Sequence, residues 1–499
     1  MSSLSDLPKP VLQLIMQFVP VMERLTICCL LSKELHAAAV AATQELELTP
    51  EQVQSAYKWM MLYGHNLKSL KVQDSTRSLL EPTAYGTSAI QSCPNLTKLV
   101  LQRDSTPFPT VGGASLARLA KLEHLDISSD SGEPFTLSHA VLPSLSALTY
   151  LHVDSLPVPG VLQLGDLARL QHLKITSDYN GANTLICGVL PRLSVLTHLH
   201  VNSLSVEGVL QLSTLTCLRE LHLNVKGDMA DGPTSTLGAA FPASLEVLTV
   251  SSAIQADFLS LVPAGLQTLR ILEGAPVQGP AEGHALFLSS MSRLQRLTEL
   301  ELALKGFNWP PVGPAYTALT ASSYLVSLEV CASNTGSTSV PSGGWPYVFH
   351  KTSHLPGLTS LNVYHIMHYG DPLPPSAWGA ADISSLVSCC PNLHSANLTL
   401  QHGRHVSELQ QLTALTSMAA VYGRDESSVY DESLKGLAVV TQLRFLNIAL
   451  DTVVWPPPSM LFLTRLTALT TFKCSSQVAD QLMELVLVDT EEDMQQVSS

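Results

Sequence analysis

One leucine pattern recurs along most of this 499-residue chain, and it constrains the fold more than any other feature. The pattern is L-x-x-L-x-[L/I/V], in weaker form toward the end, and its mean spacing is about 27 residues, which is typical of a repeat architecture. The first leucine of each unit is one of Leu67, Leu96, Leu122, Leu148, Leu170, Leu196, Leu218, Leu245, Leu266, Leu297, Leu325, Leu358, Leu393, Leu415, Leu443 and Leu469.

The spacing within a unit predicts a short strand. Positions four and six alternate with position five, so four and six face one side of the strand and five faces the other. Each unit has too little apolar surface to fold alone and must stack on its neighbours. We therefore expect an α/β solenoid, with a curved parallel sheet on the concave face and short helices, as over 116–122 and 286–297, on the convex face.

Two adjacent units also repeat as a block. Residues 141–175 match residues 189–223 at 21 of 35 positions. Duplication suits a stacking architecture and suits a single catalytic pocket poorly. The sequence contains no phosphate-binding glycine loop, zinc-protease helix, C-x-x-C or nucleophile elbow. We expect no catalytic activity, no metal and no cofactor.

Composition narrows the possible partners and compartments. The formal charge of −14 would repel phosphate backbones and anionic membrane surfaces, so neither nucleic acid nor membrane is an expected partner. No apolar stretch is continuous enough for a membrane span, and the first residues lack a basic secretory leader. The nine cysteines, an odd number, favour reduced thiols inside the cell.

The first 65 residues follow another pattern, that of helices. Val11, Leu14, Ile15, Phe18 and Val19 share one face of a predicted helix that prolines open and Pro20 ends. A second apolar run covers 25–31. A third helix is predicted over 33–42 with Ser32 as N-cap, and Thr49-Pro50-Glu51-Gln52 predicts a capping box for a helix that stops near Gly64.

These features resemble an F-box followed by leucine-rich repeats. Two units begin with Cys-Pro-Asn-Leu, at 93–96 and 390–393, like the cysteine-containing subtype found in many F-box leucine-rich-repeat proteins. The F-box order and spacing is matched by Leu7-Pro8, Val11-Leu12, Ile15, Val19-Pro20, Arg24-Leu25, Leu30-Leu31-Ser32-Lys33 and Ala37-Ala38.

The resemblance implies the substrate receptor of an SCF-type ubiquitin ligase. In such a complex the F-box binds the Skp adaptor and thereby a cullin, while the repeats hold the protein to be ubiquitinated for proteasomal degradation. The alternatives are that the helices only cap the first repeat, or that the chain is a cytoskeletal or axonemal scaffold with no ligase link. The residues expected to present the adaptor-binding surface are Leu7, Pro8, Val11, Leu12, Ile15, Leu30 and Leu31.

The predicted organisation has four parts. Residues 1–45 form the F-box-like segment, 46–66 a linker or capping helix, 67–476 the solenoid, and 477–499 a C-terminal cap with an acidic tail. The expected compartment is the cytoplasm, with the nucleus as a further location under the ligase hypothesis and the cytoskeleton or axoneme under the scaffold hypothesis.

Register predicts which side chains a partner would meet, because positions three and five of each strand point out of the sheet. Neighbouring strands lie about 4.8 Å apart, so His172 should adjoin His198, and His200 should adjoin His222. Such imidazoles could recognise a partner, share a zinc ion, or form an ordinary polar surface. The outward side chains expected to bind the substrate are His124, Tyr150, His152, His172, Lys174, His198, His200 and His222, followed by the acidic Glu299, Glu301 and Glu329.

Two tryptophans complete the predicted substrate site. Trp345 and Trp378 lie in the two longest intervals between units, next to glycine or proline. Aromatic residues on long loops are common interface anchors. The alternative is that the rings fill gaps in the neighbouring core.

Overall fold

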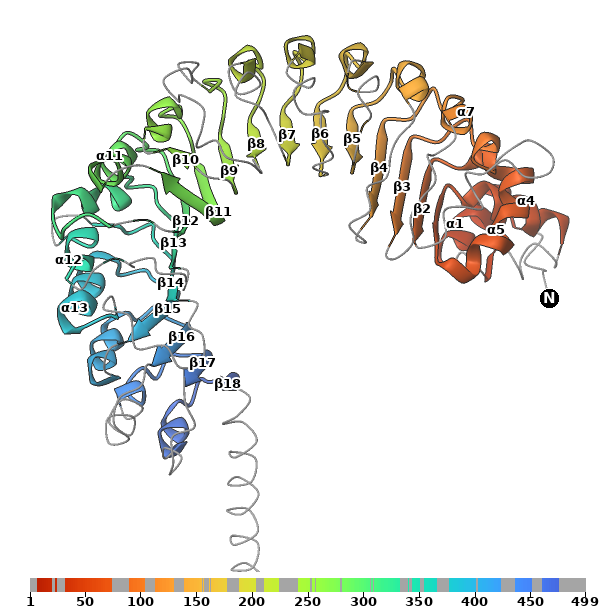
Figure 1. Ribbon diagram of the computed structural model, residues 1–499. Helices are drawn as coiled ribbons and strands as arrows, with labels where there is room; N and C mark the ends of the chain where they lie inside the picture. The colour runs from red at the N-terminus through yellow and green to blue at the C-terminus, as the bar shows by residue number, and fades with distance from the viewer. Residues whose placement is uncertain are drawn as a thin grey trace, which may run out of the picture. The chain divides into compact units, whose positions relative to one another are not determined.

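The structure is a computed structural model in which 18 strands and their helical connections are described (Figure 1). Contacts divide the chain into two units: unit 1 is Met1–Lys226 with Leu237–Ser244, and unit 2 is Gly227–Thr236 with Leu245–Ser499. Each unit is described separately below. The described residues are 7–19, 23–24, 32–73, 89–103, 113–129, 139–154, 156, 161, 163–176, 188–202, 211–223, 241–251, 254–255, 257–278, 281–305, 307, 309–332, 340, 343–350, 354–365, 377–400, 403–422, 436–450 and 460–474.

Every predicted repeat forms a strand, including the weaker ones at Leu415 and Leu469. In unit 1 consecutive strands pair in parallel from β1 to β8. The strands are β1 Glu45–Leu48, β2 Ser69–Gln73, β3 Lys98–Arg103, β4 His124–Ser129, β5 Tyr150–Val153, β6 His172–Ile175, β7 His198–Val201 and β8 Glu220–Leu223.

Unit 2 continues the same construction. Its parallel ladder runs from β9 to β11 and then in chain order to β18, while the short β10 pairs with the far end of β11. The strands are β9 Val247–Val250, β10 Ile254–Gln255, β11 Thr268–Gln278, β12 Glu299–Lys305, β13 Ser327–Ala332, β14 Ser360–His365, β15 Ser395–Leu400, β16 Ser417–Tyr422, β17 Phe445–Leu450 and β18 Thr471–Cys474.

The core of each unit consists of positions one, four and six of the repeats. Leu196, Leu199 and Val201, for example, are at most 1% exposed. They fill the space between the strands and a layer of helical segments on the other side of the sheet (Figure 1). This arrangement, a parallel strand and a helical return in each leucine-patterned unit, is a leucine-rich-repeat solenoid.

The helical layer consists more of 3₁₀ turns than of the predicted short helices. The predicted helix over 116–122 overlaps only the last residue of α7, and that over 286–297 overlaps only the second half of α11, which ends at Met291. A 3₁₀ turn uses fewer residues, which fits the shorter repeats. Unit 1 has η3 Gly64–Asn66, η4 Ala89–Ser92, α7 Gly113–Leu116, η5 His139–Ser144, η6 Leu164–Asp166, η7 Leu190–Arg192 and η8 Leu212–Thr214; unit 2 has η11 Phe258–Leu261, α11 Ala281–Met291, η12 Pro314–Thr320, α12 Trp345–Val348, α13 Ala380–Cys389, η13 Gly403–Gln411 and η14 Met460–Arg465.

Threonines directly after the first leucine of a unit join it to the preceding unit. Each donates its Oγ1 hydrogen to the backbone carbonyl at the second position of that preceding unit, at 2.9–3.4 Å. Backbone amides converge on the same carbonyls, so the start of each strand is fully paired. The threonines are Thr97, Thr149, Thr197, Thr298, Thr359, Thr416 and Thr470.

The Cys-Pro-Asn-Leu elements have a comparable role. Cys93 and Cys390 are fully buried. In the same elements Asn95 Nδ2 donates to the His65 carbonyl at 2.7 Å, and Asn392 Nδ2 donates to the Pro356 carbonyl at 3.0 Å. Both asparagines therefore join their unit to the preceding turn.

Three α-helices have described bounds before the second strand: α1 Lys9–Gln17, α4 Lys33–Ala42 and α5 Pro50–Tyr63. The predicted caps are present, since Ser32 Oγ accepts from the Leu35 amide at 3.1 Å and Gln52 Oε1 accepts from the Thr49 amide at 3.2 Å. The apolar run over 25–31 and the predicted C-terminal cap at 477–499 lie outside the described residues.

The predicted start of the sheet at residue 67 is wrong by one strand. β1 pairs with β2, with Glu45 opposite Ser69. Leu46 and Leu48 are buried in the fourth and sixth positions, and the fully buried Thr43 occupies the position of the first leucine. The leucine-based pattern missed this unit because threonine replaces that leucine.

Candidate functional site

In each unit, positions three and five of the strands form two rows on one side of the sheet, which we call the strand face of that unit. The rows of unit 1 are described first. His124, Tyr150, His172 and His198 pair in register along the third-position row. The fifth-position row contains Asp126, His152, Lys174, His200 and His222 in the same order. The predicted neighbours His172 and His198, and His200 and His222, are therefore confirmed as neighbours.

The third-position row is a ladder of stacked rings. The centroids of His124 and Tyr150 lie 4.0 Å apart with planes at 8°, and those of His172 and His198 lie 3.9 Å apart at 18°. Between the two pairs, Tyr150 and His172 are 5.8 Å apart and tilted. Because all four rings are only half-buried, their edges remain accessible from the strand face.

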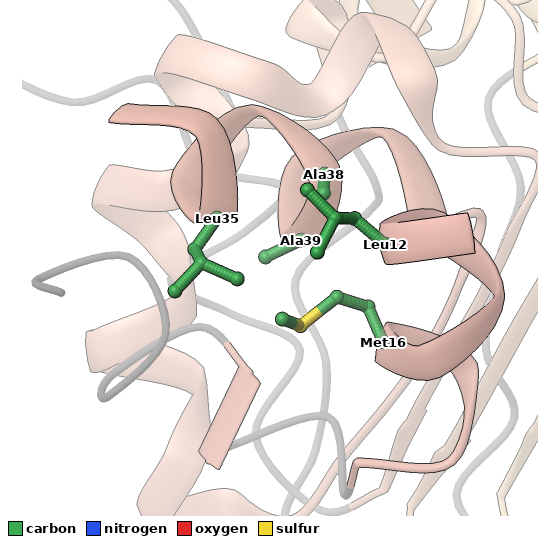
Figure 2. Packing of buried hydrophobic residues seen from close by; sticks show 5 residues of the cluster. All are labelled: Leu12, Met16, Leu35, Ala38 and Ala39. Atoms are coloured by element: carbon green, nitrogen blue, oxygen red, sulfur yellow. The ribbon is translucent and has the colours of Figure 1, made fainter. Parts of the chain in front are cut away.

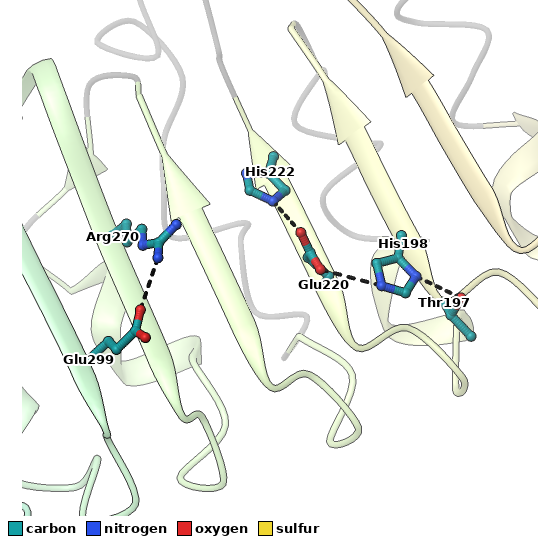
Figure 3. A network of polar contacts seen from close by, with 6 residues as sticks. All are labelled: Thr197, His198, Glu220, His222, Arg270 and Glu299. Atoms are coloured by element: carbon teal, nitrogen blue, oxygen red, sulfur yellow. Dashed lines mark hydrogen bonds and ion pairs between the residues drawn. The ribbon is translucent and has the colours of Figure 1, made fainter. Parts of the chain in front are cut away.

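Glu220 ends the ladder and links it to the fifth-position row. Its two carboxylate oxygens lie 3.3 Å from His198 Nε2 and 2.7 Å from His222 Nε2 (Figure 3). Thr197 Oγ1 and His198 Nδ1 are 2.9 Å apart, so both ring nitrogens of His198 have partners. His222 in turn stacks on His200, with ring centroids 5.2 Å apart.

Three imidazoles of this face, those of His124, His172 and His200, favour their neutral form. Burial, assisted by His222 and Lys174, lowers the pKa of His200 to about 4. Burial also lowers the pKa of His124 and of His172, with Lys98 and His198 as the next causes respectively. Near pH 7 these rings offer stacking surfaces and single hydrogen-bond donors rather than charge.

The prediction that His152 contacts a partner is wrong, because its side chain is buried. This residue is only 7% exposed, and its Nδ1 lies 2.8 Å from Asp126 Oδ1. Packing of a histidine against an aspartate on the neighbouring strand withdraws the ring from the surface. His152 therefore stabilises the strand face through its contact with Asp126 and is not exposed to a partner.

In unit 2 the corresponding rows carry the predicted acidic residues. Arg270 contacts two of them: its Nη2 lies 2.9 Å from Glu299 (Figure 3), and its Nε lies 3.7 Å from Glu301. Glu329 is the register neighbour of Glu301 on β13. Burial and then the Glu329 charge raise the pKa of Glu301, while Arg270 opposes that rise.

The two tryptophans are not surface anchors, so this part of the predicted substrate site is wrong. Trp345 is 1% exposed and Trp378 is fully buried. Their rings stack on each other with centroids 4.6 Å apart, and both contact Phe349. Trp345 and Trp378 are buried because two large rings stacked on each other remove more apolar surface from water than either ring would on the surface.

The N-terminal helices place the predicted adaptor residues in two environments. Leu12 and Met16 of α1 pack against Leu35, Ala38 and Ala39 of α4 (Figure 2). Leu12 is 2% exposed, so its predicted contact with an adaptor is wrong, because this side of α1 holds the two helices together.

The other side of α1 is exposed and apolar. Leu7 is 37% exposed and Val11 40%, and they are followed by Leu14 at 56% and Phe18 at 84%. Pro8 is exposed and Ile15 half-buried. We call Leu7, Val11, Leu14 and Phe18 the α1 stripe. Leu30 and Leu31, the remaining predicted contacts, lie outside the described residues.

The predicted sites did not include Leu14, Phe18 or Arg270. Leu14 and Phe18 are in the predicted helix face, but the pattern alone does not distinguish the side that packs on α4. Arg270 occupies the fifth position of the unit beginning at Leu266, so the register used for the histidines could have found it.

Within the described ranges, no group of three or more His, Cys, Asp or Glu side chains is placed to hold a metal ion. No helix in those ranges has both the length and the hydropathy of a membrane span.

Comparison with known proteins adds only distant structural likenesses. No protein-family model matches the sequence, and no curated protein matches it. Among solved structures, an internalin (inlF) from Listeria monocytogenes is 16% identical with a TM-score of 0.41, over 80% of this chain and 92% of that chain. The functional domain of InlJ from the same organism, which includes a cysteine ladder, is 13% identical with a TM-score of 0.40, over 78% and 69% respectively. Likenesses this weak carry no conclusion about function.

Proposed function

We propose that this chain is a non-catalytic substrate receptor of an SCF-type ubiquitin ligase. The N-terminal helices bind the Skp adaptor, which joins a cullin, and the strand face binds the protein to be ubiquitinated for proteasomal degradation. The F-box resemblance motivates the ligase assignment. The α1 stripe is the observation that carries it.

The stripe is a suitable docking element for an apolar groove or helix of an adaptor. Val11 and Leu14 lie three residues apart on one face of α1, Phe18 at the C-cap continues that face, and Leu7 precedes the N-cap Pro8. The opposite face is already occupied by α4 through Leu12. Contiguous exposed apolar patches on a protein surface often mark sites of protein binding.

Partner recognition by the repeats rests on the strand face. Its outward rows present rings and carboxylates in unit 1 and carboxylates and amides in unit 2, at regular spacing, while the buried leucines fix their positions. Side chains on paired strands are held more precisely than those on loops, which suits specific binding of a protein surface.

The adaptor assignment is tested by retention of purified Skp adaptor on the immobilised full-length chain. We expect the double substitution of Leu14→Asp and Phe18→Asp to weaken retention by about 30-fold or more, as for loss of an interface hot spot. Leu62→Asp is the matched control, because Leu62 on α5 is also exposed, at 67%, and lies outside the stripe. Thermal unfolding of each variant checks that the fold is intact.

Equal retention by the double variant and the Leu62→Asp control would contradict adaptor binding through α1. If the unchanged chain fails to retain the adaptor at all, the chain is instead a protein-interaction scaffold with no ligase link.

A further inference from the structure

The fifth-position row of unit 2 changes from a cation to a series of hydrogen-bond acceptors. Arg270 on β11 is followed by Glu301 on β12 and Glu329 on β13. Asn362 on β14 and Asn397 on β15 continue the same register. We call the four residues from Glu301 to Asn397 the acceptor row.

The arginine next to the acceptor row is already paired. Arg270 contacts both Glu299 and Glu301, at 2.9 and 3.7 Å. Among the described residues Glu329 has no cation within ion-pair distance, and its neighbour along the row is the like-charged Glu301. Two carboxylates on adjacent strands repel each other unless a cation lies between them.

Unpartnered polar atoms continue along the same row. The Oδ1 atoms of Asn362 and Asn397 are buried and accept no hydrogen bond within the described part of the chain. At the other end, Thr249 on β9 is the register neighbour of Arg270, is 6% exposed, and has an Oγ1 without a partner. A buried polar atom that remains unpaired is costly, so a donor-bearing ligand would relieve these atoms.

The neighbouring third-position row leaves room for a ligand backbone. Four consecutive strands carry serine there: Ser327, Ser360, Ser395 and Ser417. Short hydroxyl side chains permit close approach, whereas the same row in unit 1 is filled by stacked rings.

We propose that β12–β15 dock an extended, lysine- or arginine-bearing segment of the partner protein. A cationic side chain lies between Glu301 and Glu329, and the backbone crosses the serines. Strands about 4.8 Å apart place the four residues of the acceptor row over about 14 Å, the length of four or five extended residues. This inference rests on the proposed role of the strand face in binding the partner.

The test uses the full-length chain and two labelled 12-residue peptides, one alternating lysine with alanine and one alternating glutamate with alanine. Binding is followed by fluorescence anisotropy at low and at physiological salt. The chain variants are Glu329→Gln and Glu301→Gln, which remove charge and keep shape. Glu408→Gln, on η13 in the helical layer of unit 2, is the control with the same change in net charge.

We expect the lysine peptide to bind and the glutamate peptide not to bind. Glu329→Gln should weaken binding by about fivefold, the value of one moderately exposed ion pair, and the combination with Glu301→Gln should weaken it further. Glu408→Gln should leave affinity within about twofold of the unchanged chain.

Binding of the lysine peptide that is unaffected by Glu329→Gln, or equally weakened by Glu408→Gln, would overturn the inference, as would preference for the glutamate peptide. The assay contains no adaptor. Its failure therefore leaves adaptor binding intact, and loss of adaptor retention through α1 leaves the peptide result intact.

Discussion

At the residue scale, alternation along each strand separates side chains that hold the solenoid together from those that a partner can meet. Leu199 and His200 are adjacent on β7 and illustrate the two roles. Leu199 is 1% exposed, whereas His200 stacks on His222 at the strand face.

This difference predicts unequal costs of truncation. Leu199→Ala should lower the free energy of unfolding by about 2–5 kcal/mol, because it removes buried methyl groups and leaves a cavity. His200→Ala should cost less than about 1.5 kcal/mol and should act on partner binding instead. Chemical denaturation of both variants measures the difference, and equal losses would show that the assigned register is wrong.

The histidines also predict an acid-labile unit 1. A histidine whose pKa is lowered by folding binds fewer protons in the folded state than in the unfolded state, so stability falls as pH drops below about 6.5. For His200, with a pKa of about 4, the loss extends from pH 6.5 toward pH 4. Because the ring is partly exposed, we expect its contribution to be on the order of 1 kcal/mol.

Thermal unfolding between pH 7 and pH 4.5 measures this effect. His200→Gln should flatten the decline relative to the unchanged chain. The groups that face this ring are His222, Lys174, Asn202 and His152, all of which the variant retains. An unchanged pH profile in His200→Gln would show that the decline arises elsewhere.

At the scale of elements, close contacts between successive turns decide where substitutions are tolerated. Gly64 follows α5 and lies against η4, and a Cβ added there would be 2.6 Å from Cys93 Sγ and 2.9 Å from the Ser92 carbonyl oxygen. The carbonyl belongs to the backbone, so the clash requires the two turns to move apart.

Gly64→Ala should therefore destabilise the chain by about 1–3 kcal/mol, as for overpacking of a core. Gly265→Ala is the matched control, since nothing lies within 4 Å of a Cβ at that position. Urea denaturation of the two variants should show a lower midpoint for Gly64→Ala alone. A similar change in both would indicate an effect of the unfolded chain rather than of the contact.

At the scale of the whole molecule, stability is distributed over nearest-neighbour contacts, because each repeat strand pairs mainly with the strands beside it. A local defect should then remain local. Leu199→Ala should increase amide hydrogen exchange in β6–β8, which pair with or contain the substituted strand, and leave β13–β15 unchanged. Hydrogen exchange with mass spectrometry measures both regions, and equal increases would show that the chain unfolds as one cooperative body.

The sequence by itself determined the repeat, its register and hence the composition of the core. Leucine spacing carries this information because every unit must bury the same three positions against its neighbours. The lateral pairs His172 with His198 and His200 with His222 followed from register alone, as did the caps at Ser32 and Thr49, which depend on local hydrogen bonds.

Only the tertiary structure decided which outward residues remain accessible. Burial depends on neighbours that are distant in sequence: Trp345 stacks on Trp378, His152 meets Asp126 from the adjacent strand, and Leu12 faces α4. For the same reason the strand β1, whose unit has Thr43 in place of a leucine, became evident only through its pairing with β2. Periodicity specifies the direction of a side chain, whereas the contacts made by that side chain are specified by what folds over it.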